Sequence, residues 1–139
     1  MELKDLKVYG FNIEYKDKLD LLQKALEIYA SLINITKDNV YLRPKLVKVL
    51  AFYMLFDYSN ETKEIIRSSL GKKLPNGEVV PMDEKNLNQI NCELTSKGFL
   101  IRDRNNMRKK HLSNETKILK EYFLSGDYMK IFMTKFTKI

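Results

Sequence analysis

Residues 83–123 read DEKNLNQINCELTSKGFLIRDRNNMRKKHLSNETKILKEYF, and this stretch decides the fold. The aspartate that opens it is a good N-terminal cap for a helix, and Gly98 is a good C-terminal stop for the same helix. The apolar residues that recur at helical spacing between them are Leu87, Ile90 and Leu94. Apolar and polar side chains then alternate over residues 99–112, around Arg104-Asn105-Asn106, and Ser113 can cap a closing helix. We therefore predict a helix, a two-stranded β-hairpin and a second helix.

Two further helices are predicted before this stretch. Residues 44–57 are apolar nearly all round and begin with a proline, which suits the first position of a helix, so we expect this segment to be the central buried helix. Ser59 or Asn60 can cap the next helix, which runs to Leu70. Its predicted inward residues are Ile65, Ile66 and Leu70. Gly71 is predicted to end this helix in the left-handed conformation.

The two ends of the chain, and the segment before the deciding stretch, predict smaller elements. Residues 6–15 have alternating apolar positions and predict a short strand or an irregular hairpin, and residues 17–34 predict a helix with one apolar face. Asn76-Gly77, which lies between apolar residues, predicts a hairpin turn within residues 72–82. The tail, residues 128–139, is predicted to be extended, and it could pair with the N-terminal strand.

Together these elements predict a mostly α fold of the α+β class. A winged helix consists of three helices followed by a hairpin, the wing. Here the three helices would be residues 44–57, 60–70 and 84–97, and the wing would be residues 99–112. We expect a single domain, 1–139, in which an extra N-terminal helix and short terminal strands are added to this unit. Its predicted parts are a strand and helix appendage at 1–40, a winged-helix core at 41–124 and an extended C-terminal tail at 125–139.

Part of the deciding stretch resembles the MarR-like branch of winged-helix regulators. Leu94-Thr95-Ser96-Lys97-Gly98-Phe99-Leu100-Ile101-Arg102 matches the family's pattern of a leucine, polar residues, a glycine and an apolar pair that enters the wing. Asn106-Met107-Arg108-Lys109-Lys110-His111-Leu112-Ser113 resembles its wing, which returns through basic residues to the next helix. The family's Asp-x-Arg is Asn106-Met107-Arg108 here, and the family's short turn between the second and third helices is replaced by residues 71–82. The resemblance implies a DNA-binding regulator.

The positive charge of the chain is unevenly distributed. The formal net charge is +7; residues 1–40 carry 6 Lys and Arg against 7 Asp and Glu, whereas residues 41–139 carry 19 against 11. Such an uneven distribution is the usual mark of a polyanionic partner. A composition rich in Lys, Asn and Ile is also what an AT-rich genome produces, but three of the five arginines lie between residues 102 and 108. Composition alone does not explain that cluster.

Candidate DNA contacts fall in the hairpin and on the helix before it. In the hairpin they are Arg102, Arg104, Asn105, Asn106, Arg108, Lys109 and Lys110, against one acid, Asp103. On the helix they are Lys85, Asn86, Asn88 and Gln89, with Glu93 on the same predicted exposed side. Basic side chains bind phosphates, and Asn and Gln can bond adenine edges. Two plainer interpretations stay open: a solvated hairpin whose charges prevent edge-to-edge aggregation, and an ordinary wet helix surface.

Other classes of function find little support. His111 is the only histidine and Cys92 the only cysteine, so we predict neither a metal site nor a catalytic array, and we expect no enzyme and no cofactor. We interpret His111 as a surface residue and Cys92 as a packing residue. The longest apolar run, residues 49–56, is too short for a membrane span, which needs roughly 20 residues, and the start of the chain lacks the pattern of a signal peptide. We expect a cytoplasmic protein, or one of a host cytoplasm or a virion if a phage encodes it.

Two hypotheses follow. The first is a small basic winged-helix protein that binds double-stranded DNA as a transcription or replication regulator and acts as a homodimer, with helices 17–34 and 114–124 available for the dimer interface. The alternative is a phage-type structural or protein-interaction component, a virion protein or a modulator of host machinery, that uses the same fold without DNA. Residues 71–82 and the aromatic tail would then carry the interface, and an acidic protein partner could use the basic hairpin. The aromatic side chains of the tail could also stack on bases, although their alternation suits a strand better.

Overall fold

The computed structural model describes residues 11–36, 42–106, 109–124, 128–129 and 134–139. Its helices are α1 (Lys18–Thr36), α2 (Pro44–Phe56), α3 (Asn60–Ser69), α4 (Glu84–Ser96) and α5 (Asn114–Leu124). Its strands are β1 (Phe11–Tyr15), β2 (Lys72–Lys73), β3 (Val79–Val80), β4 (Leu100–Arg102), β5 (Lys110–Leu112), β6 (Tyr128–Met129) and β7 (Thr134–Lys138). Helices dominate and the sheets are small, which confirms the predicted mostly α, α+β class. None of the helices within these ranges is long and apolar enough to cross a membrane.

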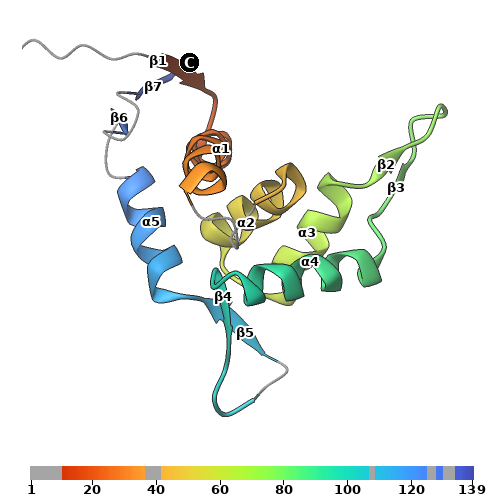
Figure 1. Ribbon diagram of the computed structural model, residues 1–139. Coiled ribbons are helices and arrows are strands. Elements are labelled where there is room, and N and C mark those ends of the chain that lie inside the picture. Colours follow the sequence, from red (N-terminus) through yellow and green to blue (C-terminus); the bar gives the residue numbers. More distant parts are fainter. Residues whose placement is uncertain (1–10, 37–41, 107–108, 125–127, 130–133) are drawn as a thin grey trace, which may run out of the picture.

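The central helix is α2, as its sequence predicts (Figure 1). Its buried residues are Leu46, Val47, Val49, Leu50, Ala51, Phe52, Tyr53 and Met54. The physical reason is that α2 is in contact with α1, α3, α4 and α5, so apolar side chains on most of its sides meet another helix. Pro44 occupies its first position, where a missing N–H removes no intrahelical hydrogen bond.

The predicted helix starts are confirmed by side-chain caps. The side chains of Ser59, Asp83 and Ser113 accept hydrogen bonds from the backbone N–H groups of Thr62, Lys85 and Thr116, at 3.1, 3.1 and 3.2 Å. Each cap satisfies a donor that the first turn of the helix cannot pair internally. The starts of α3, α4 and α5 are therefore determined by short polar side chains at these three positions.

The end of α4 is also the one predicted. Gly98 has a φ of +87°, a conformation that residues with a Cβ atom rarely adopt. Its N–H donates to the carbonyl of Thr95 at 3.1 Å, and the N–H of Phe99 donates to the carbonyl of Leu94 at 3.0 Å. These two bonds form the Schellman motif, which turns the chain out of α4 and into β4.

The segment between α3 and α4 forms the hairpin β2–β3, as Asn76-Gly77 predicts, with Lys72 paired to Val80. Gly71 at its base does not adopt the predicted left-handed conformation, so that prediction is wrong. A Cβ atom at Gly71 would instead collide with the carbonyl oxygen of Val80. The glycine is required because two backbones approach closely there, and not because the helix needs a left-handed stop.

The hairpin β4–β5 is anchored at its base and free of the core beyond it. Leu100 pairs with Leu112, and both side chains are buried. The hydroxyl of Thr116, on α5, donates to the carbonyl of Phe99 at 2.8 Å and ties the base of the hairpin to the closing helix. Residues 107 and 108, in the turn, lie outside the described residues.

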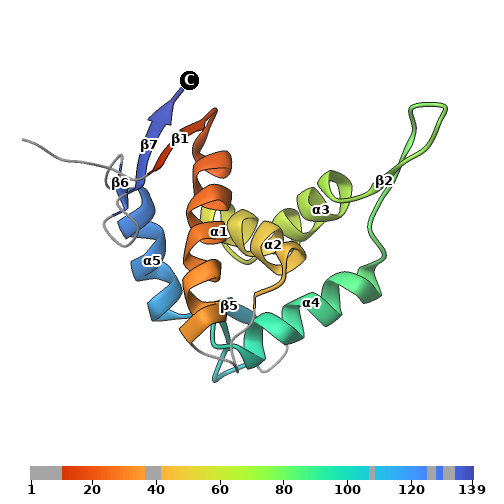
Figure 2. The same cartoon turned by 45° about the horizontal axis from the view of Figure 1, so that its top comes forward.

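β1 and the two C-terminal strands form a three-stranded sheet with the order β1-β7-β6. β1 runs parallel to β7, from Phe11 opposite Thr134 to Tyr15 opposite Lys138, and β6 pairs with β7 in antiparallel fashion. The prediction that the tail pairs with the N-terminal strand is confirmed. The part of the predicted N-terminal element before Phe11 lies outside the described residues. Figure 2 places this sheet beside α1 and α5, at the end of the molecule opposite to β4–β5.

Two predictions about individual side chains are wrong. Ile65 is 40% exposed, because α3 buries only the narrow stripe of Thr62 and Ile66, one turn apart, against its neighbours. Cys92 is exposed and is therefore not a packing residue, whereas its neighbour Asn91 is buried. The side chain of Asn91 accepts a hydrogen bond from the buried hydroxyl of Tyr53, which accounts for a polar residue at this inward position.

The two helices considered for a dimer interface pack against each other within the chain. Tyr29 of α1 and Phe123 of α5 meet edge to face, with ring centroids 6.3 Å apart. On the outer side of α5, Ile118 is 66% exposed. A homodimer formed through these helices stays a prediction.

Candidate nucleic-acid interface

The outer side of α4 carries the predicted polar candidates. Lys85, Asn86, Asn88 and Gln89 are all exposed. The residues that α4 buries on its other side, Leu87, Ile90 and Leu94, are at most 2% exposed. The hairpin β2–β3 does not cover the outer side, because in both views it projects away from α4 (Figures 1 and 2). These four side chains are therefore accessible to a partner.

Glu93, the acidic residue considered on this helix, is bound within the protein. Arg43, which precedes α2, donates from Nη2 to Glu93 Oε1 at 2.7 Å and from Nε to Glu93 Oε2 at 3.2 Å. The hydrogen bonds from Arg43 lower the pKa of Glu93 below its ordinary value. The pair joins α4 to the start of α2 and compensates one acidic charge beside the candidate surface.

The basic hairpin, residues 100–112, has two distinct faces because successive side chains of a strand point to opposite sides. Arg102 and Lys110 are opposite one another, on the same face as the buried pair at the hairpin base. Lys110 Nζ lies 3.9 Å from the sulfur of Cys92 on α4. The face that carries Arg102 and Lys110 is therefore turned toward α4, whereas Ile101 and His111 are exposed on the other face.

Further candidates occupy the turn of the basic hairpin. Arg104, Asn105 and Asn106 are exposed. The backbone N–H of Asp103 donates to the carbonyl of Lys109 at 2.9 Å, and the Asp103 carboxylate accepts a hydrogen bond from the backbone N–H of Asn105 at 2.8 Å. The acid of the hairpin thus organises its turn. Arg108 lies outside the described residues.

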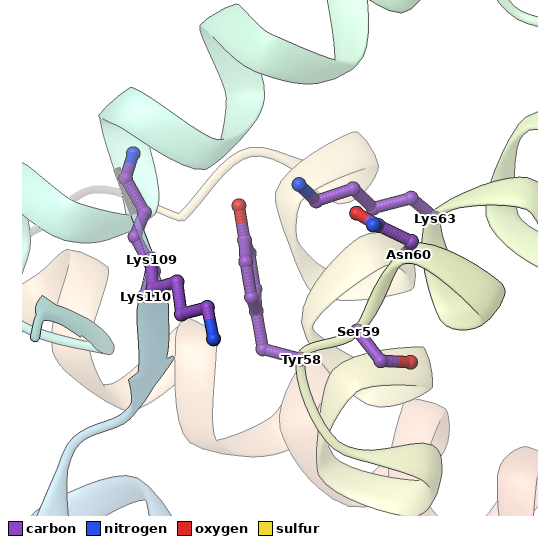
Figure 3. Close-up of a pocket in the computed structure, with 6 residues that line it drawn as sticks. All are labelled: Tyr58, Ser59, Asn60, Lys63, Lys109 and Lys110. Atoms are coloured by element: carbon purple, nitrogen blue, oxygen red, sulfur yellow. The ribbon is translucent and has the colours of Figure 1, made fainter. Parts of the chain in front are cut away.

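A pocket of about 320 Å³ lies between the start of α3 and the basic hairpin (Figure 3). It is lined by Tyr58, Ser59, Asn60, Lys63, Lys109 and Lys110. Only the last two are among the candidates predicted from the sequence. The other four were missed because no local pattern indicates that the start of α3 and the end of the hairpin lie together. The available signal was a lysine in the first turn of a helix, Lys63, four residues after the capping residue Ser59.

The tyrosine in this pocket is supported from the core. The ring of Tyr58 lies 4.8 Å from the ring of Tyr53, measured between centroids. The hydroxyl of Tyr53 donates to Asn91 Oδ1 at 2.8 Å, and burial raises the pKa of Tyr53, so this hydroxyl stays protonated. Tyr58 therefore packs on a buried tyrosine, Tyr53, and the hydroxyl of that tyrosine links α2 to α4.

Comparisons with known proteins find no relative: no family model, no curated protein and no solved structure matches the chain. The resemblance of residues 94–113 to the MarR-like wing region therefore stays an expectation from the sequence. Within the described ranges, no group of three or more His, Cys, Asp or Glu side chains could hold a metal ion.

Proposed function

We propose that α2, α3, α4 and the basic hairpin form a winged helix that binds double-stranded DNA, and that the protein acts as a small DNA-binding regulator. The observation that carries the proposal is the position of the basic hairpin relative to α4. The Arg102–Lys110 face of the hairpin is turned toward α4, with Lys110 beside Cys92. The polar residues of α4 and the basic residues of the hairpin therefore belong to one continuous surface.

The surface has the chemistry that a duplex requires. Arg and Lys side chains of the hairpin would neutralise backbone phosphates, which supplies most of the affinity for DNA. Asn86, Asn88 and Gln89 are exposed on a helix that could enter the major groove, and amide side chains can bond adenine edges. Arg43 forms an ion pair with Glu93 and so offsets a negative charge that would repel phosphates at this side of α4. We assign the affinity mainly to the hairpin.

The experiment is a titration of a random-sequence duplex, followed by fluorescence anisotropy at low and moderate salt. Arg102→Ala with Arg104→Ala should weaken binding at least about tenfold, and log K should fall linearly with log salt. Lys72→Ala with Lys73→Ala is the matched control, because it also removes two positive charges, but from the hairpin β2–β3, which projects away from α4. Equal losses in the two double variants would mean that only net charge matters and would defeat the proposal.

Cys92 offers a second and independent readout. It is the only cysteine of the chain, it is exposed, and it lies between the polar side of α4 and Lys110. Bound duplex should therefore slow the reaction of Cys92 with a maleimide several-fold, and salt that dissociates the complex should restore the rate. An unchanged rate in a solution where anisotropy reports saturated binding would place the DNA elsewhere.

One observation favours the alternative of a protein partner. Val79 and Val80, on the projecting hairpin β2–β3, are 50% and 47% exposed and offer apolar surface to a partner. A protein-binding component would use these side chains and not the basic hairpin. Val79→Ser with Val80→Ser should leave duplex affinity unchanged under the DNA hypothesis. If the wild-type protein gives no anisotropy change with duplex even at low salt, the protein-binding alternative is preferred.

A further inference from the structure

We propose that the pocket between the start of α3 and the basic hairpin is a phosphate-binding site that holds one backbone phosphate of a bound nucleic acid. This inference rests on the proposed function and adds to it a site of which only Lys109 and Lys110 are predicted from the sequence. The site joins two elements, α3 and β5, that are far apart in the sequence.

The charges that line the pocket favour an anion. Lys63, Lys109 and Lys110 contribute three ammonium groups, and no carboxylate is among the lining residues. The ion pairs between described residues join other cations, Lys24, Arg43 and Arg67, to acids. Like charges gathered without a counter-charge repel one another, and a bound anion converts this repulsion into attraction.

Tyr58 contacts one of the three lysines and lies between it and the other two. Lys63 Nζ lies 4.7 Å from the centre of the Tyr58 ring, a distance at which the ring face attracts a cation. In Figure 3 the ring stands between Lys63 on one side and Lys109 and Lys110 on the other. Because Tyr58 itself packs on Tyr53, the ring that Lys63 contacts is supported by the core.

The start of α3 adds to the same attraction. Its first turn presents backbone N–H groups and the positive end of the helix dipole, which favour a phosphate. Ser59 Oγ is already used as the cap of Thr62, whereas Asn60 is exposed at the rim of the pocket. The two non-bridging oxygens of a backbone phosphate share its negative charge and point in different directions, so they can engage ammonium groups from both sides of the tyrosine at once.

The position of the pocket assigns the phosphate to a nucleic acid. Lys109 and Lys110 belong both to the pocket and to the basic hairpin, and Lys110 also contacts α4. A backbone phosphate held in the pocket would thus lie beside the surface formed by α4 and the hairpin. The basic hairpin and the start of α3 would contact the same nucleic-acid strand from two directions.

The test compares single-lysine variants of the full chain in duplex titrations over a range of salt. Lys63→Ala should lower affinity about three- to tenfold and reduce the slope of log K against log salt by about one. Lys63→Arg should keep the duplex affinity of the wild type. Lys72→Ala, on β2, should have the same affinity and the same salt dependence as the wild type. Thermal unfolding of each variant should change only slightly, because Lys63 is partly buried at the protein surface and its contact with Tyr58 is a single cation–π interaction.

The outcomes separate this inference from the proposed function. If Lys63→Ala binds as the wild type does while Arg102→Ala with Arg104→Ala loses affinity, the pocket is not a phosphate site and the DNA-binding proposal survives. If neither variant loses affinity, the proposed function itself fails. Inorganic phosphate, added at constant ionic strength, distinguishes the source of the anion. If inorganic phosphate competes with the duplex, the pocket binds phosphate of any kind. If Lys63→Ala lowers duplex affinity but inorganic phosphate does not compete, the pocket binds the backbone diester.

Discussion

Glu93 belongs both to the fold and to the border of the proposed binding surface. It lies on α4, 50 positions after the arginine that binds it, and the two side chains form a two-pronged pair. Both side chains are partly exposed, at 39% and 41%, so water screens much of their attraction. The pair is therefore expected to contribute less to stability than to the position of α4 on α2.

The Glu93 pair should make stability depend on pH in the acid range. Its pKa is lowered in the folded protein from an ordinary value of 4.5 by the hydrogen bonds from Arg43, so the unfolded chain binds a proton first as the pH falls. The stabilisation is complete above pH 4.5 and is lost as the pH drops through the pKa that Glu93 has in the folded protein, which is lower. Glu93→Gln should therefore reduce the free energy of unfolding by less than about 1 kcal/mol at neutral pH, and by less still in acid.

Urea unfolding of the wild type and Glu93→Gln, at several pH values on both sides of 4.5, measures this difference. Glu64→Gln is a suitable control, because the Glu64–Arg67 pair lies within one helix and the Glu64 side chain is 70% exposed. If the difference in the free energy of unfolding between the wild type and Glu93→Gln stays constant through the acid range, the charge of the carboxylate is not what stabilises the pair.

At the scale of elements, the hairpin β2–β3 is the clearest departure from a minimal three-helix unit. It is held at its base by Arg67, whose Nε donates to the carbonyl of Met82 at 2.7 Å, while the N–H of Met82 donates to the carbonyl of Arg67 at 2.9 Å. Gly71 allows the two legs of the hairpin to approach each other at this point. The hairpin therefore projects from a fixed base.

Substitutions at the two glycines of this hairpin should fail for different reasons. Gly71→Ala should destabilise the protein by about 1–3 kcal/mol, because a Cβ atom there would meet the backbone of Val80. At Gly77 a Cβ atom would meet no other atom within 4 Å, but the φ of this residue is +90°. Alanine should therefore cost about 1 kcal/mol of backbone strain there. Asparagine tolerates positive φ and should cost less than alanine at Gly77, whereas at Gly71 it should be at least as damaging.

Chemical unfolding of the four variants tests this ordering. If asparagine were better tolerated than alanine at Gly71 as well, the requirement there would be conformational, as the sequence predicts, and not steric. None of the four substitutions touches the basic hairpin, so duplex affinity should be unchanged in each.

For the whole molecule, the terminal sheet and the basic hairpin occupy opposite ends (Figure 2). β7 is the central strand of the terminal sheet, and beyond its ladder the N–H of Ile139 donates to the carbonyl of Tyr15 at 2.8 Å. Ile13 and Tyr15 of β1 pack partly against the core. The sheet thus closes one end of the helical core without taking part in the surface proposed to bind DNA.

Removal of residues 134–139 should therefore separate stability from binding. Without β7, β1 loses its hydrogen-bonding partner, and the free energy of unfolding should fall by roughly 2 kcal/mol or more. At a temperature where the shortened chain is still folded, its duplex affinity should equal that of the full chain. Unfolding at an unchanged temperature would contradict the role given to the terminal sheet, and a loss of affinity by the folded variant would contradict the division between the two ends.

The sequence by itself determined the elements and most of their limits. Capping side chains, the positive φ of Gly98 and the Asn-Gly turn act within a few residues, so the chain encodes them locally. The apolar character of α2 likewise predicts its central place. The basic hairpin and the polar side of α4 were predictable for the same reason: strand alternation and helical spacing decide which side chains share a face.

The tertiary structure alone decided which neighbours these faces meet. Asn91 is buried because Tyr53 of α2 offers it a hydrogen bond, whereas Cys92, the next residue along α4, stays exposed although Lys110 of β5 lies beside it. The pocket that contains Lys63 exists because the start of α3 and the end of the basic hairpin converge. Such contacts depend on how helices pack against one another at a distance in sequence, and no local pattern of residues encodes that geometry.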